Sequence, residues 1–179
     1  LERSAGMFNQ VTMDGGAEQR LLNPSFPSYN FDVIDGVTYE IDLSEPSKFD
    51  PDGGLANPDA NRIKNLSFNG QPVTDDMEFV IATNNYRASG GGAFPGADGS
   101  TVIFEAPDTN RDVIVRYIVE QGTIEPSADA NWRFAPMTGA SVLFETGPKA
   151  ADYIDDLKGV DISPVGDGAD GFALFRLNL

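Results

Sequence analysis

The chain has 179 residues, and 40% of them are hydrophobic, which is enough apolar material for the core of one domain of ordinary size. It carries 28 acidic against 12 basic residues, and the net charge of -16 argues against long nucleic acids and anionic membrane surfaces as partners. The sequence contains neither His nor Cys, so it cannot supply the imidazole ligands that a catalytic two-metal centre ordinarily uses.

The first half of the chain is predicted to be mainly strands. Asp35-Gly36 and Asn69-Gly70 each lie between apolar or alternating runs, a pattern typical of tight two-residue hairpin turns. We therefore expect hairpins over residues 31–43 and 63–73. Residues 45–60 lie between them and are rich in Pro, Asp, Gly and Asn, which predicts a long surface loop.

Within this loop, the run that begins at Asp50 (DPDGG) resembles half of a calcium-binding loop. It lacks the third oxygen position and the downstream bidentate Glu, so we interpret it as a solvated acidic loop.

A strand-like run, residues 77–83, leads into a loop that combines aromatic, amide and guanidinium side chains with glycines (NNYRASGGGAFPG, residues 84–96). An aromatic face stacks on any planar base, and amides can read the base's edge, so this composition is typical of a pocket for a flat ring. The alternative is an ordinary surface loop whose aromatics only complete the core. No Lys-Ser or Lys-Thr pair follows the glycines, which argues against a phosphate-binding loop.

The second half alternates helices and strands. Helical spacing predicts a helix over residues 110–121, capped by Asp108 or Thr109 and ended by Gly122. Strands are predicted at residues 132–137, 141–145 and 171–179, with a shorter helix at 148–158. Trp132 begins an apolar strand, which favours core packing over a stacking platform. The prediction is an α+β fold with mixed or antiparallel sheets and packed helices, forming a single domain over residues 1–179.

Three motifs, in this order and spacing, resemble the C-terminal domain of the 5'-nucleotidase family: residues 27–42, 61–73 and the loop at 82–96. Within that family, the chain most resembles the bacterial periplasmic 2',3'-cyclic-nucleotide 2'-phosphodiesterase/3'-nucleotidases, whose C-terminal ends also carry counterparts of residues 1–6, 108–111, 131–136 and 144–146. The resemblance covers nearly all of the chain. It implies that this is an N-terminally truncated recognition domain, and that a pair of divalent metals sits in a separate N-terminal metallophosphoesterase domain.

The resemblance also assigns substrate-binding residues. It implies that Tyr86 is one of two aromatics that sandwich the base, the other lying upstream of Leu1. Asn84 and Asn85 flank Tyr86 and are expected to fix the loop or read the base edge. Tyr29 and Asn30 match a segment that borders the same pocket.

Gly90 and Gly91 match the family's glycine pair. In the classical 5'-nucleotidases an Asp follows this pair and holds the ribose hydroxyls, whereas this chain has Gly92, so the resemblance leaves the ribose contact unassigned. The family's phosphate-facing arginines precede Leu1, so Arg87 is given no such role. The resemblance therefore predicts a chain with no catalytic residue, no metal ligand and no cofactor of its own, inactive by itself.

We expect a nucleotide or nucleoside as the ligand and a periplasmic or other extracytoplasmic bacterial location. No signal peptide or membrane span is identified in the sequence. We expect truncation to leave an unpaired sheet edge or an apolar patch, and therefore expect the chain to self-associate. Two alternatives stay open: a stand-alone ligand-binding or surface-interaction module without a catalytic partner, and a loop that serves packing only.

Overall fold

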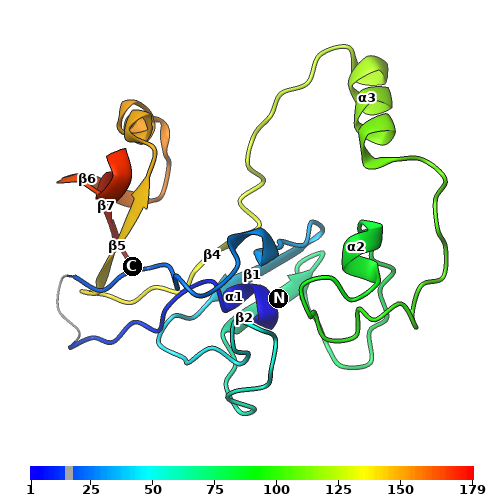
Figure 1. The fold of residues 1–179 in the computed structure, drawn as a ribbon, viewed down its shortest axis with the longest axis horizontal. Helices are drawn as coiled ribbons and strands as arrows, with labels where there is room; N and C mark the ends of the chain where they lie inside the picture. The colour runs from blue at the N-terminus through cyan, green and yellow to red at the C-terminus, as the bar shows by residue number, and fades with distance from the viewer. Residues whose placement is uncertain (15–17) are drawn as a thin grey trace. The chain divides into compact units, whose positions relative to one another are not determined.

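The computed structural model describes residues 1–14 and 18–179. They divide into two compact units, one made of residues 1–73 and 131–179 and the other of residues 74–130. Together their elements are two β-sheets and a few helices, so the predicted α+β class is confirmed (Figure 1). The prediction of a single domain stays a prediction.

The first unit contains a four-stranded sheet in the order β3-β2-β1-β4. Its strands are β1 (Val37–Ile41), β2 (Ile63–Phe68), β3 (Gln71–Pro72) and β4 (Trp132–Phe134). β1 pairs antiparallel with β2 and parallel with β4. The predicted second hairpin is confirmed: Asn69 and Gly70 both have positive φ, 50° and 75°, as a two-residue turn of this type requires.

The predicted first hairpin is wrong. The turn at Asp35-Gly36 exists, with Gly36 at φ 90°, but residues 31–36 are irregular. The reason is that both edges of β1 are occupied, by β2 and by β4. The side chain of Asn131 donates instead to the carbonyls of Ile34 and Val37, at 2.7 and 3.2 Å.

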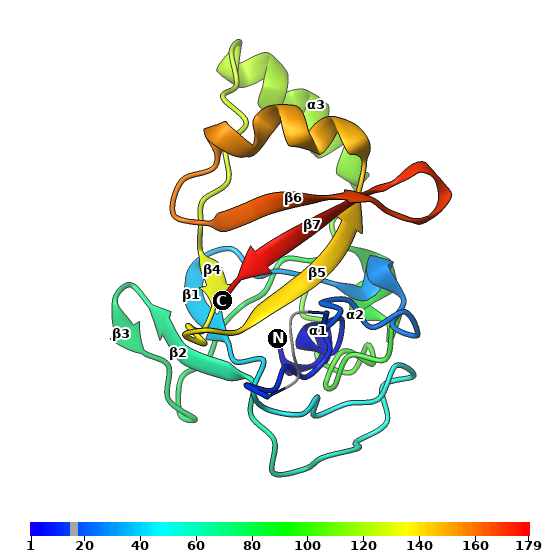
Figure 2. The same ribbon diagram turned by 90° about the vertical axis from the view of Figure 1, so that its left-hand side faces the viewer.

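The first unit also contains a three-stranded antiparallel sheet in the order β5-β7-β6 (Figure 2). Its strands are β5 (Ser141–Thr146), β6 (Asp161–Asp167) and β7 (Ala173–Asn178). β5 and β7 were predicted; β6 was not. Pro164 and Gly166 disfavour a strand in the sequence, and the pairing shifts register between them, which an edge strand tolerates.

Short helical segments complete this unit. They are α1 (Glu2–Ala5) and three 3₁₀ helices, η1 (Ser28–Asn30), η2 (Pro148–Asp156) and η3 (Ala169–Gly171). The predicted helix at 148–158 is thus present as a 3₁₀ helix two residues shorter than expected.

The core of the first unit joins α1, β1 and the second sheet. Its buried members include Phe8, Ile41, Leu43 and Val142. Trp132 packs at the margin of this core, with ring centroids 5.5 Å from Phe31 and from Phe134. Trp132 therefore belongs to the packing, as predicted.

Arg62 is a charged side chain inside this core and is only 1% exposed. Its guanidinium donates to the carbonyls of Ala5 at 2.8 Å, Phe8 at 2.7 Å and Glu45 at 2.9 Å. Burial is the main reason that its pKa falls to about 10, partly offset by Glu2 and two further carboxylates. The bonds tie α1 to the start of the long loop at 45–60, which is irregular as predicted.

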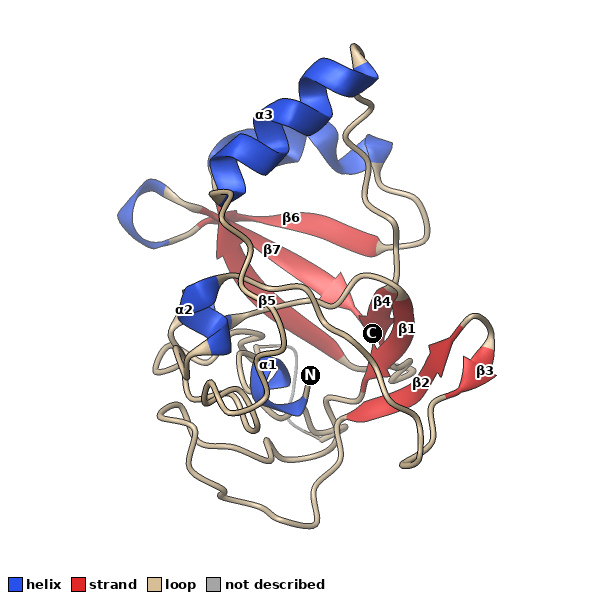
Figure 3. Ribbon diagram, turned by 90° about the vertical axis from the view of Figure 1, so that its right-hand side faces the viewer, coloured by secondary structure: helices blue, strands red, loops and turns tan. Residues whose placement is uncertain are grey.

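The second unit contains two helices, α2 (Asn85–Ala88) and α3 (Asn110–Gln121), joined by irregular chain (Figure 3). α3 has the predicted bounds: Thr109 and Asp112 form a capping box at its start, and Gly122 ends it at φ 71°. Residues 77–83 were expected to form a strand and are irregular and exposed instead, because strand propensity yields a strand only where a partner completes the ladder. None of the helices in the described part of the chain has the length and apolarity that crossing a membrane needs.

Candidate functional site

The loop that sequence analysis singled out is organised by the short helix α2. Asn84 caps this helix, and its side-chain oxygen accepts from the backbone N–H of Arg87 at 2.8 Å. A bridge between Ser89 and Asp98 closes the loop further along. Of the two roles expected for Asn84, fixing the loop or reading the base edge, the capping bond serves the first.

Tyr86 is carried on α2 with 59% of its surface exposed. Its backbone oxygen accepts from the N–H of Gly91 at 2.8 Å, which brings the glycine run back against the tyrosine. A Cβ at Gly91 would lie 2.4 Å from Cε1 of the Tyr86 ring. The close approach of ring and backbone therefore requires glycine at position 91.

Gly90 and Gly92 are required for a different reason, since both have positive φ, 99° and 80°. A side chain at this φ is uncommon, so the backbone conformation suits the glycine at both positions.

Arg87 is the buried residue of this loop, with 8% of its surface exposed. Its guanidinium donates to the carbonyl of Gly91. The guanidinium carbon lies 4.1 Å from the centroid of the Phe94 ring and 5.7 Å from that of Tyr86. Sequence reasoning withheld a phosphate-binding role from Arg87, and it missed this internal arrangement because the contacts depend on how the glycines fold.

The remaining predicted residues are distributed over both units. Asn85 is the exposed first residue of α2 in the second unit. Tyr29 and Asn30 lie in η1 of the first unit, where Tyr29 is 74% exposed and Asn30 is buried. The expectation that these two border the pocket of Tyr86 stays a prediction.

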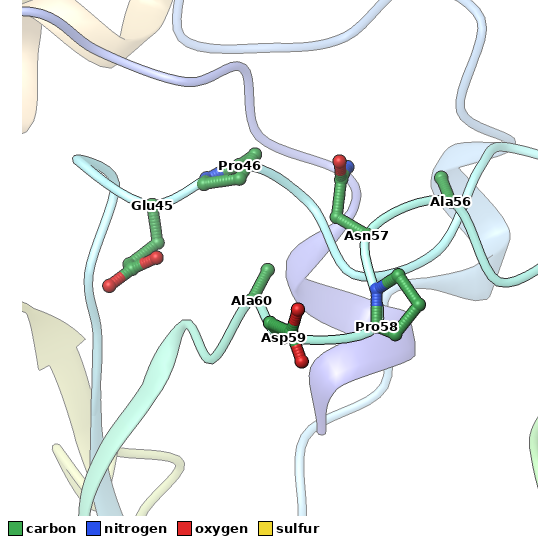
Figure 4. Close-up of a pocket in the computed structure, with 7 residues that line it drawn as sticks. All are labelled: Glu45, Pro46, Ala56, Asn57, Pro58, Asp59 and Ala60. Atoms are coloured by element: carbon green, nitrogen blue, oxygen red, sulfur yellow. The ribbon is translucent and has the colours of Figure 1, made fainter.

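An open hollow of about 340 Å³ lies elsewhere, in the long loop of the first unit (Figure 4). It is lined by Glu45, Pro46 and residues 56–60, and the carboxylate of Glu45 lies 3.5 Å from Nζ of Lys64. Sequence reasoning assigned no function to these residues, and none coincides with the predicted substrate-binding set.

The acidic run at residues 50–54 folds on itself. The carboxylate of Asp50 accepts from the backbone N–H groups of Asp52 and Gly54, at 2.9 and 2.7 Å. This oxygen serves the local turn. Within residues 1–14 and 18–179, no group of three or more acidic side chains is gathered closely enough to hold a metal ion.

Comparison with known sequences defines the class of protein. The profile of the family described as "5'-nucleotidase, C-terminal domain" matches residues 6–99. Since this is more than half of the chain, the chain belongs to that family.

Several curated bacterial proteins are similar to it. A trifunctional nucleotide phosphoesterase protein of Bacillus subtilis is 45% identical over 99% of the chain. The 2',3'-cyclic-nucleotide 2'-phosphodiesterase/3'-nucleotidases of Salmonella typhimurium and Haemophilus influenzae are 44% and 42% identical over the whole chain. The chain spans only 12% of the first relative's length and 29% of the other two. No solved structure matches the chain.

Proposed function

We propose that this chain is the nucleoside-recognition part of a metal-dependent 2',3'-cyclic-nucleotide 2'-phosphodiesterase/3'-nucleotidase. In this proposal the intact protein hydrolyses cyclic phosphodiesters and 3'-nucleotides in the periplasm or another extracytoplasmic compartment of a bacterium. The support is the identity of 42–44% to relatives that carry this name, over the full length of the chain.

The observation that carries the proposal is that the exposed ring of Tyr86 is held by contacts with its own loop. Its ring is more than half exposed, yet it rests against Gly91 and close to the guanidinium of Arg87. If Tyr86 served packing alone, we would expect its ring to be buried and not held at the surface by these contacts. A ring held at the surface offers a face on which a base can stack, worth about 1–3 kcal/mol.

The chemistry belongs to a different part of the protein in this proposal. The chain has no His or Cys, and the described residues gather no acidic group of three or more, so they do not fit a metal pair. We assign the divalent metals to an N-terminal metallophosphoesterase domain. The share of this chain is to bind the nucleoside and so to position the phosphate.

The test is replacement of Tyr86 in the intact protein, with 3'-AMP as substrate. Stacking holds the base equally in the ground and transition states, so its loss raises KM more than it lowers kcat. We expect Tyr86→Ala to raise KM about 5-fold to 150-fold, and Tyr86→Phe to have little effect because the ring face remains.

Tyr153 supplies a matched control. It is a tyrosine of nearly the same exposure, 63%, on η2 in the other unit, and no ligand role is assigned to it. Tyr153→Ala is expected to leave KM unchanged. If Tyr86→Ala left KM unchanged but lowered Tm sharply, Tyr86 would be a packing residue and the proposal would fail.

A further inference from the structure

Arg87 contacts three parts of the loop at once. Its guanidinium carbon lies 4.1 Å from the Phe94 ring centroid and 5.7 Å from that of Tyr86, and one of its N–H groups donates to the carbonyl of Gly91. The side chain is enclosed by the protein, with 8% of its surface exposed. One cation therefore links the aromatic on α2, the glycine run and the aromatic that follows that run.

These contacts restrain Tyr86 in two ways. The Gly91 backbone lies against the edge of the ring at Cδ1 and Cε1, and the guanidinium lies over the ring. A half-exposed tyrosine without such neighbours samples several rotamers, and fixing one of them on binding costs about 0.5–1.5 kcal/mol. The restraint removes part of that cost before any ligand arrives.

We propose that Arg87 is a positioning residue for base recognition: held over Phe94 and bonded to Gly91, its guanidinium keeps the Tyr86 ring in the orientation that stacks on the substrate's base. This inference rests on the proposed function of Tyr86. It assigns Arg87 to the loop interior and to no phosphate. A planar guanidinium suits the role because it can lie over an aromatic ring and donate to a carbonyl simultaneously, whereas an ammonium group is a single point charge.

The first experiment is a double-mutant cycle in the intact enzyme with 3'-AMP. Arg87→Ala is made in the wild-type background and in the Tyr86→Ala background. Loss of the cation–π contacts is expected to raise KM about threefold to tenfold in the wild-type background, with kcat retained. In the Tyr86→Ala background Arg87→Ala is expected to add nothing, because the group it positions is gone. Arg87→Lys is expected to recover part of the lost affinity.

Two kinetic results would overturn the inference. One is an equal rise in KM in both backgrounds, which would mean that Arg87 acts on the substrate directly. The other is a fall in kcat in both backgrounds, which would mean that Arg87 supports the enzyme generally. If Tyr86→Ala itself has no effect on KM, it is the proposed function that fails.

The second experiment needs no activity and separates the two failures. In the 179-residue chain, the NMR signals of the Tyr86 ring report whether the ring is ordered. Arg87→Ala is expected to move these signals to the positions of a freely rotating tyrosine, while the fluorescence of Trp132, in the other unit, keeps its wild-type unfolding midpoint. Unchanged Tyr86 signals would show that Arg87 does not order the ring, whatever the kinetics.

Discussion

Gly91→Ala tests whether the position of the Tyr86 ring matters for binding, without changing the ring itself. The new Cβ would lie 2.4 Å from Cε1 of Tyr86, 2.5 Å from its Cδ1 and 2.5 Å from its backbone oxygen. The ring can swing away from the methyl group. The carbonyl oxygen moves only with the backbone, so the loop must open.

The energy of this clash can be bounded from its parts. Forcing a methyl group into a filled site costs about 1–3 kcal/mol, and the bond from the Gly91 N–H to the Tyr86 carbonyl contributes about 1 kcal/mol more. α2 has only four residues, so this energy exceeds the stability of the helical turn. We therefore expect the loop to rearrange locally while the first unit stays folded.

The expected result is a rise in KM for 3'-AMP in the intact enzyme comparable to that of Tyr86→Ala, about 5-fold to 150-fold, with kcat retained. The urea midpoint of Trp132 fluorescence should not move. Gly147→Ala is the matched control: a Cβ there meets no described atom within 4 Å, and φ is already -56°. A wild-type KM for Gly91→Ala would refute the reasoning, because it would mean that the position of the ring has no bearing on affinity.

Three further predictions concern the rest of the chain. Arg62→Ala removes the side-chain donor of three carbonyls, two of them buried and one part-buried, and should lower the free energy of unfolding of the first unit by about 3 kcal/mol, measured by urea titration of Trp132 fluorescence; a change below about 1 kcal/mol would contradict it. Hydrogen bonds from Arg133 and from the side-chain amide of Asn65 lower the pKa of Glu40. Because the folded pKa lies below the unfolded one, near 4.5, these bonds stabilise the folded state fully above pH 4.5, and this stabilisation is lost as pH falls through the folded pKa. Arg133→Ala should therefore flatten the loss of stability on the acid side of pH 4.5, and an unchanged pH profile would count against it. Every residue of α3 is exposed, including its apolar ones, so the isolated chain should self-associate in light scattering; a monomer at high concentration would be the contrary result.

The parts of the fold that the sequence predicted are those with local causes. The helix at 110–121 was predicted with its observed bounds because the candidate caps Asp108 and Thr109 and the terminal Gly122 lie directly beside the segment. The turn at Asn69-Gly70 likewise needs only its own two residues and the runs beside them. Local chemistry of this kind can be recognised from a single sequence.

The parts that were mispredicted depend on distant partners. β1 pairs in parallel with β4, which follows it by more than ninety residues, and nothing near Asp35-Gly36 indicates that this partner takes the edge that a hairpin would need. β6 is a strand because β7 lies beside it, in spite of Pro164 and Gly166. Residues 77–83 have strand composition without a ladder. In each case pairing overrides propensity.

The candidate site divides in the same way. The composition of its loop predicts Tyr86 and the glycine pair as substrate-binding residues, because aromatics and glycines have recognisable uses in a binding loop, and this stays a prediction. The burial of Arg87 could not be predicted, since it follows from the return of the chain through Gly91 towards Phe94. That return also explains why an arginine beside a candidate stacking residue need not face the ligand.

The charge of the chain bears on what such a loop can recognise. A net charge of -16 opposes the binding of an anion. The guanidinium of Arg87, beside Tyr86, donates to the Gly91 carbonyl and lies over the Phe94 ring. Stacking needs no positive charge, because every base offers a π face to an aromatic ring. Under the proposed function, an acidic recognition domain therefore suits the uncharged end of a nucleotide. In the same proposal the phosphate, which such a surface repels, is left to the metals of another domain, so that affinity and chemistry would be supplied by separate parts of one protein.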